Sequence, residues 1–409
     1  MLIPAGTGSS GSASAGRFAN HPAEGKIRGG GPRGDALSDR LNWPGLPAHL
    51  RRLRIEEGRS RMGDGSTKKE AGMARTHSEP RTGSLLGLGG YLLGVDIGGY
   101  GLQAALADGQ GRLLSTAQQP LEAGTEASQV VLAALEMSRG LLRESGLEAR
   151  QLLRIGIGFG GPVDVQQGVT ILSHRMPGWE GYPLRQVFEE AFHTAALVDN
   201  DARVTALGEM LYGAGRGARS LFYIHLSSGV GGGLVLDGQI YRGATTTAGE
   251  IGHTLVLEGG PECSCGRPGH LEALVSAPAL IARARELARD DPEPLEARAR
   301  EEGRGLRFQH VVEAARQGHA PSRQVLSEAA HYLAIAVANL VNLLNPERVV
   351  LGGIVARLAG EDLLEPLREE VSRLAMAVPG RAVRIVLGTL GETSVVVGAI
   401  ALALRSLEE

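Results

Sequence analysis

The chain has 409 residues, of which 43% are hydrophobic, so it is long enough for two domains with buried cores. Residues 1–90 hold 14 of the 42 basic and 8 of the 45 acidic side chains, so the rest carries a net charge of −9, which argues against a nucleic-acid partner. No lysine follows Lys69, which excludes a Walker A lysine, a lysine Schiff base and a lysine general base from the rest of the chain.

Residues 1–88 are predicted to form a disordered extension. They hold 16 of the 60 glycines and only two aromatic residues, Phe18 and Trp43, so they offer little apolar surface to bury. The N-terminus lacks the basic-then-apolar order of a secretory signal, and no apolar run reaches the ~18–20 residues of a membrane span. We therefore expect a cytoplasmic protein with no membrane partner.

The first ordered segment reads as a three-stranded meander followed by a helix and a strand. An apolar run from Tyr91 ends in Asp96-Ile97-Gly98-Gly99, and Leu102–Ala107 and Arg112–Ala117 alternate enough to be its partner strands. Apolar residues recur at helical spacing over Glu126–Ser145, and Leu153–Phe159 returns to strand character. This order predicts an α/β domain over residues 89–200.

The second half repeats this order and predicts a second α/β domain over residues 201–409. Leu221–Leu226 is an apolar strand that leads into a glycine-rich turn ending at Gly233. Later, a long helix over Ser322–Leu344 precedes the strand Arg348–Gly353, and a last helix is expected over 394–407.

Two glycine-rich turns follow apolar strands, one at Asp96, Gly98 and Gly99 and one over Gly229–Gly233. Without a Cβ atom, such turns let backbone N–H groups approach phosphate oxygens, and Asp96 could hold Mg²⁺ or its water. Tight hairpins select glycine as well, so each turn by itself has a purely structural alternative.

Asp199-Asn200-Asp201 stands between an apolar strand, Ala196–Val198, and a helix that runs to about Tyr212. An Asp at this place can be a helix N-cap. It can also be a general base that accepts a proton from an alcohol, with the neighbouring Asn orienting the same substrate.

The chain has only two cysteines, Cys263 and Cys265, and one intervening residue makes a disulfide between them awkward. Together with His253 and His270 they offer two thiolates and two imidazoles, which predicts a closed, structural Zn²⁺ site. The alternative is two free thiols on a loop beside unrelated histidines.

Glu250 and Glu272 flank this loop. They can be solvated surface carboxylates. If zinc fixes the loop, however, both carboxylates are held near one place, where they could bind vicinal hydroxyls of a sugar.

From about Tyr91 to Leu407 the chain resembles the ROK family of repressors, open reading frames and kinases. This is a glucokinase-like group with the actin-like, ribonuclease-H-like ATPase fold. The resemblance rests on motifs in one order: Asp96-Ile97-Gly98-Gly99; Gly160-Gly161-Pro162-Val163-Asp164; Met176-Pro177-Gly178-Trp179; Asn200-Asp201-Ala202; Ser228-Gly229-Val230-Gly231-Gly232-Gly233; Ala248-Gly249-Glu250-Ile251-Gly252-His253; Cys263-Ser264-Cys265-Gly266; Asn345-Pro346-Glu347; and Gly352-Gly353.

The resemblance implies two actin-like domains with a cleft between them, in which ATP phosphorylates a hydroxyl of a hexose or N-acetylhexosamine. Asp201 matches the catalytic base of the family. The sugar-binding positions implied are Gly161, Asn200, Asp201, Glu250, His253 and Glu272. The ATP-binding positions implied are Asp96, Gly98, Gly99, Gly229, Gly231, Gly352 and Gly353, and the zinc ligands carry over to His253, Cys263 and Cys265.

Two positions depart from the family pattern. The kinases usually continue Asp-x-Gly-Gly with Thr-Lys, whereas this chain has Tyr100-Gly101, which puts ATP binding in question. A zinc-binding cysteine of the family is replaced here by His270, and imidazole is an acceptable zinc ligand.

A sugar kinase is therefore the leading hypothesis. The rival is a sugar-sensing regulator that does no chemistry and lacks its own DNA-binding domain, because residues 1–90 show no pattern of three helices. A zinc hydrolase is the third reading, but four candidate ligands leave no open coordination position. A homodimer is the general expectation for a soluble oligomer.

Overall fold

The computed structural model describes residues 89–408, except 100, 123, 174–176, 291 and 304. The extension predicted over residues 1–88 lies outside the described residues. All described residues belong to one compact unit, Glu70–Glu409.

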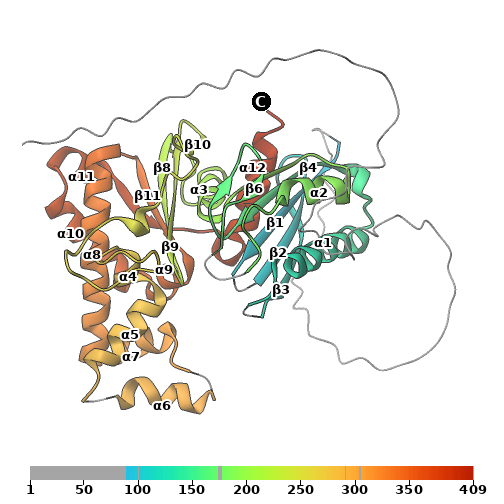
Figure 1. The fold of residues 1–409 in the computed structure, drawn as a ribbon. Coiled ribbons are helices and arrows are strands. Elements are labelled where there is room, and N and C mark those ends of the chain that lie inside the picture. Colours follow the sequence, from blue (N-terminus) through green and yellow to red (C-terminus); the bar gives the residue numbers. More distant parts are fainter. Residues whose placement is uncertain are drawn as a thin grey trace, which may run out of the picture. The chain divides into compact units, whose positions relative to one another are not determined.

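The first half of this unit is built on a five-stranded sheet in the order β3-β2-β1-β4-β7 (Figure 1). β1 pairs antiparallel with β2 and parallel with β4, so the meander continues into a parallel sheet. The bounds are β1 Tyr91–Gly98, β2 Gly101–Asp108, β3 Leu113–Pro120, β4 Leu152–Phe159 and β7 Ala196–Asn200, with the short pair β5 Val163–Asp164 and β6 Val169–Thr170 beside it.

The second half holds another five-stranded sheet, in the order β10-β9-β8-β11-β12. β8 pairs antiparallel with β9 and parallel with β11, which repeats the pattern around β1. The bounds are β8 Ser220–Leu226, β9 Val230–Leu236, β10 Gln239–Tyr241, β11 Arg348–Gly352 and β12 Arg384–Leu387.

The helices cover both faces of each sheet (Figure 1). In the first half they are α1 Ala127–Glu144, α2 Leu184–Phe192 and α3 Asp201–Tyr212. In the second half they are α4 Glu272–Val275, α5 Ala277–Leu287, α6 Glu293–Glu301, α7 Phe308–Arg316, α8 Ala320–Leu344, α9 Gly353–Ala359, α10 Glu361–Leu374, α11 Ala377–Ala382 and α12 Ser394–Arg405, and short 3₁₀ turns lie at Ala149–Gln151, Ile251–His253 and Gly391–Thr393.

The helices α3 and α12 lie between the two sheets. Leu92, on one face of β1, packs with Val396 and Ile400 of α12, whereas Leu93 on the other face packs with α1 and α2. In β8, Leu221 and Tyr223 pack with α3 and α12. The alternate residues Phe222 and Ile224 face the core around α8. Because side chains alternate along a strand, each sheet presents one complete face to the α3–α12 pair.

Glycines on the strands let α12 lie close to the first sheet. A Cβ atom at Gly156 of β4 would stand 1.8 Å from the carbonyl oxygen of Ala399, and one at Gly94 of β1 would stand 2.6 Å from that of Val396. The last helix of the chain thus packs on the first sheet. The predicted boundary between residues 200 and 201 assigned this helix to the second domain. The division into two domains stays a prediction.

The strands and helices predicted from the sequence are present, with bounds that differ by a few residues. Among the described residues one helix, α8, is long and apolar enough to span a membrane, with a mean hydropathy of 1.2. The sequence analysis did not predict an apolar segment of this length. In its most apolar window 61% of the residues are buried inside the protein, which is typical of a core helix.

Candidate active site

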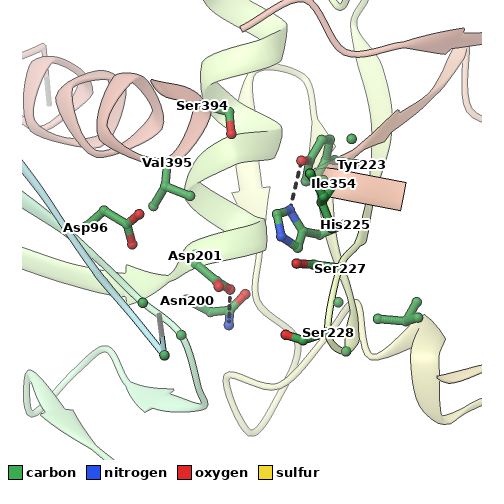
Figure 2. A pocket seen from close by; sticks show the side chains of 18 of the residues that line it. Asp96, Asn200, Asp201, Tyr223, His225, Ser227, Ser228, Ile354, Ser394 and Val395 are labelled. Atoms are coloured by element: carbon green, nitrogen blue, oxygen red, sulfur yellow. Dashed lines mark hydrogen bonds between the residues drawn. The ribbon is translucent and has the colours of Figure 1, made fainter. Parts of the chain in front are cut away.

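The carboxyl ends of the parallel strands of both sheets meet at one cavity of about 1320 Å³. In open α/β sheets this is the usual place for ligands. The cavity brings together every residue predicted to bind sugar or nucleotide: Asp96, Gly98, Gly99, Gly161, Asn200, Asp201, Gly229, Gly231, Glu250, His253, Glu272, Gly352 and Gly353. Their individual roles stay predictions. Figure 2 shows part of the cavity, with Asp96 and Asp201 on one side and His225, Ser227 and Ser228 on the other.

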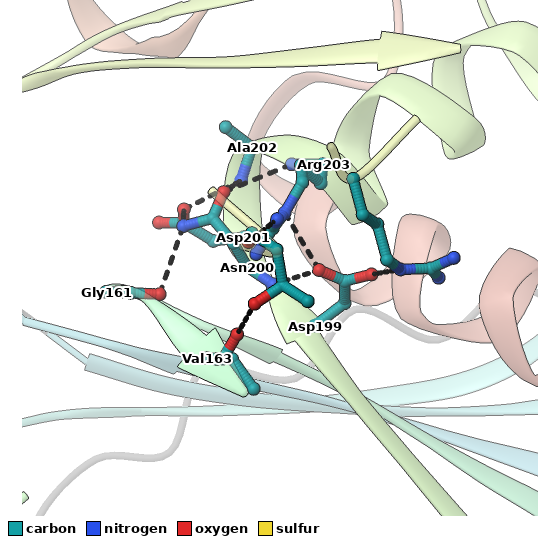
Figure 3. A network of polar contacts seen from close by, with 9 residues as sticks. Gly161, Val163, Asp199, Asn200, Asp201, Ala202 and Arg203 are labelled. Carbon is teal, nitrogen blue, oxygen red and sulfur yellow. Dashed lines mark hydrogen bonds and ion pairs between the residues drawn. The ribbon is translucent and has the colours of Figure 1, made fainter. Parts of the chain in front are cut away.

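Asn200, and not an aspartate, is the N-cap of α3. Its Oδ1 accepts hydrogen bonds from the backbone N–H groups of Ala202 and Arg203 at 3.1 and 3.3 Å. Its Nδ2 donates to the carbonyl oxygen of Gly161 at 3.2 Å and to Oδ1 of Asp201 at 3.0 Å (Figure 3). The amide thus orients the neighbouring carboxylate, and its predicted contact with a sugar stays a prediction.

Asp201 stands at the first position of α3 and lines the cavity. Its Oδ1 receives two hydrogen bonds, from Nδ2 of Asn200 and, at 2.7 Å, from its neighbour Ala202 N–H. A carboxylate oriented in this way at the rim of a cavity can accept a proton from a bound alcohol.

The buried carboxylate of Asp199, beside these two residues, holds the adjoining loop in place. Nε of Arg203 lies 2.9 Å from its Oδ1, and Nε of Arg242 lies 2.7 Å from its Oδ2. Arg203 also donates to the carbonyl oxygen of Thr246. The hydroxyl of Thr246 donates in turn to the carbonyl oxygen of Val163 at 3.0 Å. This network (Figure 3) joins the loop before Glu250 to the end of β7. Removing one partner from such a buried pair costs about 3–5 kcal/mol of stability.

Asp96 lies on the α12 side of β1, the face that also carries Leu92 and Gly94. It lines the cavity near Val395 (Figure 2). Desolvation, followed by repulsion from the charge of Asp201, raises the pKa of Asp96 well above its usual value. A cation bound here would relieve both effects, so the site fits the Mg²⁺ role predicted for Asp96.

Glu250 and Glu272 reach the cavity from the loop side. Desolvation raises the pKa of Glu250. The charges of His253 and Arg203 oppose this effect, and those of Asp201 and Glu272 add to it. The carboxylate of Glu272 accepts hydrogen bonds from the backbone N–H of Val230 at 3.0 Å and from the hydroxyl of Ser264 at 2.5 Å. Glu272 therefore links the glycine-rich turn after β8 to residues 253–270, the segment with both cysteines, which we call the cysteine loop.

His253, Cys263, Cys265 and His270 form one cluster, in which the ligand atoms all lie within 4.8 Å of one another. Sγ of Cys263 lies 3.5 Å from Nδ1 of His253, and Sγ of Cys265 lies 3.2 Å from Nδ1 of His270. Two sulfur and two nitrogen donors that converge from a short loop fit a tetrahedral zinc ion. His253 also lines the cavity, so it can serve the cluster through Nδ1 while its ring faces a substrate.

The polar residues of the cavity that the sequence analysis missed include Tyr223, His225 and Glu209. The carboxylate of Glu209, buried in α3, accepts from the backbone N–H groups of Ala214, Thr389 and Leu390, so it braces the end of β12. Tyr223 and His225 alternate along β8 immediately before the glycine-rich turn. Strand alternation alone places them on one face, which is the signal that could have found them.

The comparisons with known proteins agree with this architecture. The family model described as ROK family matches residues 92–406. A glucokinase from Halalkalibacterium halodurans is 34% identical over 313 residues, which cover 75% of this chain and 93% of the relative. The crystal structure of a ROK family glucokinase from Streptomyces griseus in complex with glucose and AMPPNP superposes with a TM-score of 0.67 at 31% identity, over 77% of this chain and all of that one.

Repressors are also among the relatives. A xylose repressor from Caldicellulosiruptor bescii is 28% identical over 318 residues, which cover 78% of this chain and 79% of the repressor. The actin-like fold expected from the motifs is confirmed by the match to the solved glucokinase. The chain therefore belongs to the ROK family, as its motifs predicted.

Proposed function

We propose that the protein is a sugar kinase that transfers the γ-phosphoryl group of ATP to a hydroxyl of a hexose or N-acetylhexosamine. The observation that carries the proposal is the position of Asp201, an oriented carboxylate in a cavity lined by the glycine-rich ends of β1 and β11 and the turn after β8. The similarity to glucokinases, one of them solved with glucose and AMPPNP, supports it.

In this proposal Asp201 accepts the proton of the sugar hydroxyl as that hydroxyl attacks the γ-phosphorus. Glu250, His253 and Glu272 bind other hydroxyls of the sugar, and the glycine turns let backbone N–H groups approach the phosphates. Asp96 holds Mg²⁺ or its water. Bound Mg²⁺ neutralises charge that develops on the phosphates.

Zinc has a structural part in the proposal. His253, Cys263, Cys265 and His270 hold it, and it braces the loop that carries two of the sugar-binding residues. Because all four donors converge on one point, no position is left for a catalytic water.

A sugar-sensing regulator is the second candidate, and two observations favour it. Xylose repressors are 24–28% identical to the chain. In addition, Tyr100-Gly101 replaces the usual Thr-Lys. The coverage of the relatives favours the kinase, since the match spans 93% of a glucokinase but 79% of a repressor.

A sugar panel separates the two candidates. The full chain is incubated with ATP, Mg²⁺ and glucose, N-acetylglucosamine, N-acetylmannosamine or xylose, and ADP release and thermal stability are measured. The kinase predicts ADP release that depends on one of the sugars. Thermal stabilisation by a sugar without ADP release would favour the regulator.

A further inference from the structure

The cavity holds many carboxylates and little positive charge. Its acidic residues are Asp96, Asp201, Glu209, Glu250, Glu272 and Glu392. Among the described residues that line it, only Arg357 has a permanent positive charge, and this guanidinium lies 3.0 Å from the carboxylate of Glu392. No lysine follows Lys69 in the chain. A bound triphosphate therefore needs hydrogen-bond donors of another kind, besides its metal ion.

His225 lies beside the glycine-rich turn that is proposed to bind the phosphates. It is the last residue of β8 that faces the α3–α12 side, because Leu221 and Tyr223 face that side and side chains alternate. The turn Ser227–Gly229 follows directly, and the half-buried imidazole lines the cavity across from Asp201 (Figure 2).

Glycines stand opposite this imidazole on both neighbouring strands. The residue opposite His225 on β9 is Gly231, and the one opposite on β11 is Gly352. Neither has a side chain, and the place of the missing Cβ atoms is taken by Ala202 at Gly231 and by Tyr223 at Gly352, so a ligand reaches the ring from the cavity that His225 lines. A Cβ atom at Gly352 would meet the Tyr223 hydroxyl at 2.2 Å, so the glycine also makes room for the partner of His225.

Tyr223 is placed so that it can fix the orientation and the tautomer of the ring. Its hydroxyl lies 3.0 Å from Nδ1 of His225 (Figure 2). Burial, with the nearby charges of Glu209 and Asp201, raises the pKa of Tyr223, so the phenol keeps its proton. A protonated phenol can donate to Nδ1, and a neutral imidazole that accepts at Nδ1 carries its own proton on Nε2.

We propose that His225 donates a hydrogen bond from Nε2 to the phosphate chain of the bound nucleotide, and that Tyr223 is the positioning residue that holds the imidazole for this contact. The inference deepens the proposed function and rests on it for the identity of the nucleotide. It names a donor for the phosphates in a chain whose first phosphate turn continues with Tyr100-Gly101.

The test is calorimetric titration of the full chain with AMPPNP and Mg²⁺. His225→Ala is expected to weaken binding about tenfold to a hundredfold, the range for a hydrogen bond to a charged group. His225→Gln, whose amide can donate, should recover part of the loss, and Tyr223→Phe should show a smaller loss. His331→Ala, on the exposed side of α8, is the matched control and should bind as the wild type does.

A purely structural role would lower thermal stability and glucose binding together with AMPPNP binding, whereas the proposed contact leaves glucose binding within about twofold of the wild type. AMPPNP binding by His225→Ala within about twofold of the wild type would overturn the inference, and so would an equal loss of both ligands. If the wild type binds AMPPNP and His225→Ala does not, but no sugar elicits ADP release, the inference stands and the kinase proposal fails. If the wild type binds no AMPPNP, both fail.

Discussion

Asn200 and Asp201 divide two tasks that one side chain could not perform at the same time. Asn200 uses its carbonyl oxygen to cap α3 and its amide nitrogen to hold Asp201. Asp201 is the first residue of the helix and not its N-cap, and its carboxylate, which accepts a hydrogen bond from the Ala202 N–H, lines the cavity. The sequence left open whether an aspartate here was a cap or a base. The structure assigns the N-cap to Asn200, and the base role of Asp201 stays a prediction.

Asp96 is expected to lower stability at neutral pH. Its folded-state pKa is raised above the unfolded value of about 3.9, so the folded protein binds the proton more tightly and loses stability as the pH rises from there through the raised pKa. Asp96→Asn should raise the free energy of unfolding at pH 7 by about 0.5–2 kcal/mol. The difference should shrink toward pH 4, and Mg²⁺-dependent activity should be lost.

Asp108, at the end of β2, is the matched control because its shift has the opposite sign. Despite burial, hydrogen bonds from Arg112 and from the backbone N–H of Gln110 lower its pKa. Its contribution is present above about pH 3.9 and is lost as the pH falls through the lowered pKa. Asp108→Asn should cost about 1–3 kcal/mol at pH 7. Urea unfolding of both variants from about pH 2 to about pH 8 measures the two slopes, and slopes of equal sign would contradict this assignment.

At the scale of the elements, the crossing of α3 and α12 depends on two glycines. A Cβ atom at Gly398 would stand 2.2 Å from the carbonyl oxygen of Val204, and one at Gly208 would stand 2.9 Å from the Cα of Gly398. Gly398→Ala should therefore destabilise the protein by about 1–3 kcal/mol, although alanine is the better helix former.

Gly140 in α1 provides the control for that substitution, because a Cβ atom there would meet only the end of the Arg143 side chain, at 3.9 Å. Gly140→Ala should stabilise the protein by about 0.5–1 kcal/mol through helix propensity. Thermal and urea unfolding of the two variants measure both changes in stability. A stabilising Gly398→Ala would mean that the helices do not cross as closely as described.

The cysteine loop should depend on its metal as one element. The purified protein is expected to contain about one zinc ion per chain, and Cys263→Ser or a strong chelator should remove it. Loss of zinc should lower the free energy of unfolding by more than about 2 kcal/mol and weaken sugar binding, because Glu272 is tied to this loop through Ser264. Metal analysis, thermal unfolding and sugar titration measure the three effects. Unchanged sugar binding by the zinc-free protein would contradict the structural role.

How far the elements could be predicted depends on how local their signal is. The meander after Tyr91 and the long helix α8 carry their periodicity within one segment, and both were predicted. The contact of α12 with the first sheet joins residues about 300 positions apart, such as Gly94 and Val396. The local sequence feature that relates to this contact is glycine within apolar strands. Such glycines are equally typical of a β-bulge or of a strand that a ligand approaches closely.

At the scale of the whole molecule, the site is made where two sheets with the same order of strands direct their carboxyl ends to one cavity. The sequence predicted the glycine turns, Asp201 and the cysteine loop, because each has its own motif. It did not predict Tyr223 and His225, because alternation along β8 places them on one face but only the pairing of β8 with β9 and β11 sets the glycines Gly231 and Gly352 opposite His225. Motifs identify ligand-binding turns, whereas the residues that orient the ligand between them depend on strand register.

Phosphoryl transfer to a sugar, with Asp201 as the base, is the central claim. Phosphorus NMR that follows ATP, Mg²⁺ and the preferred sugar with the wild type and Asp201→Asn tests it most directly. The wild type should form a sugar phosphate, and Asp201→Asn should form it ~10²–10⁴-fold more slowly while it binds the sugar with nearly unchanged affinity. Asp164→Asn, a carboxylate that does not line the cavity, should behave as the wild type does. A sugar phosphate formed by Asp201→Asn at the wild-type rate, or none formed by the wild type with any sugar, would contradict the account.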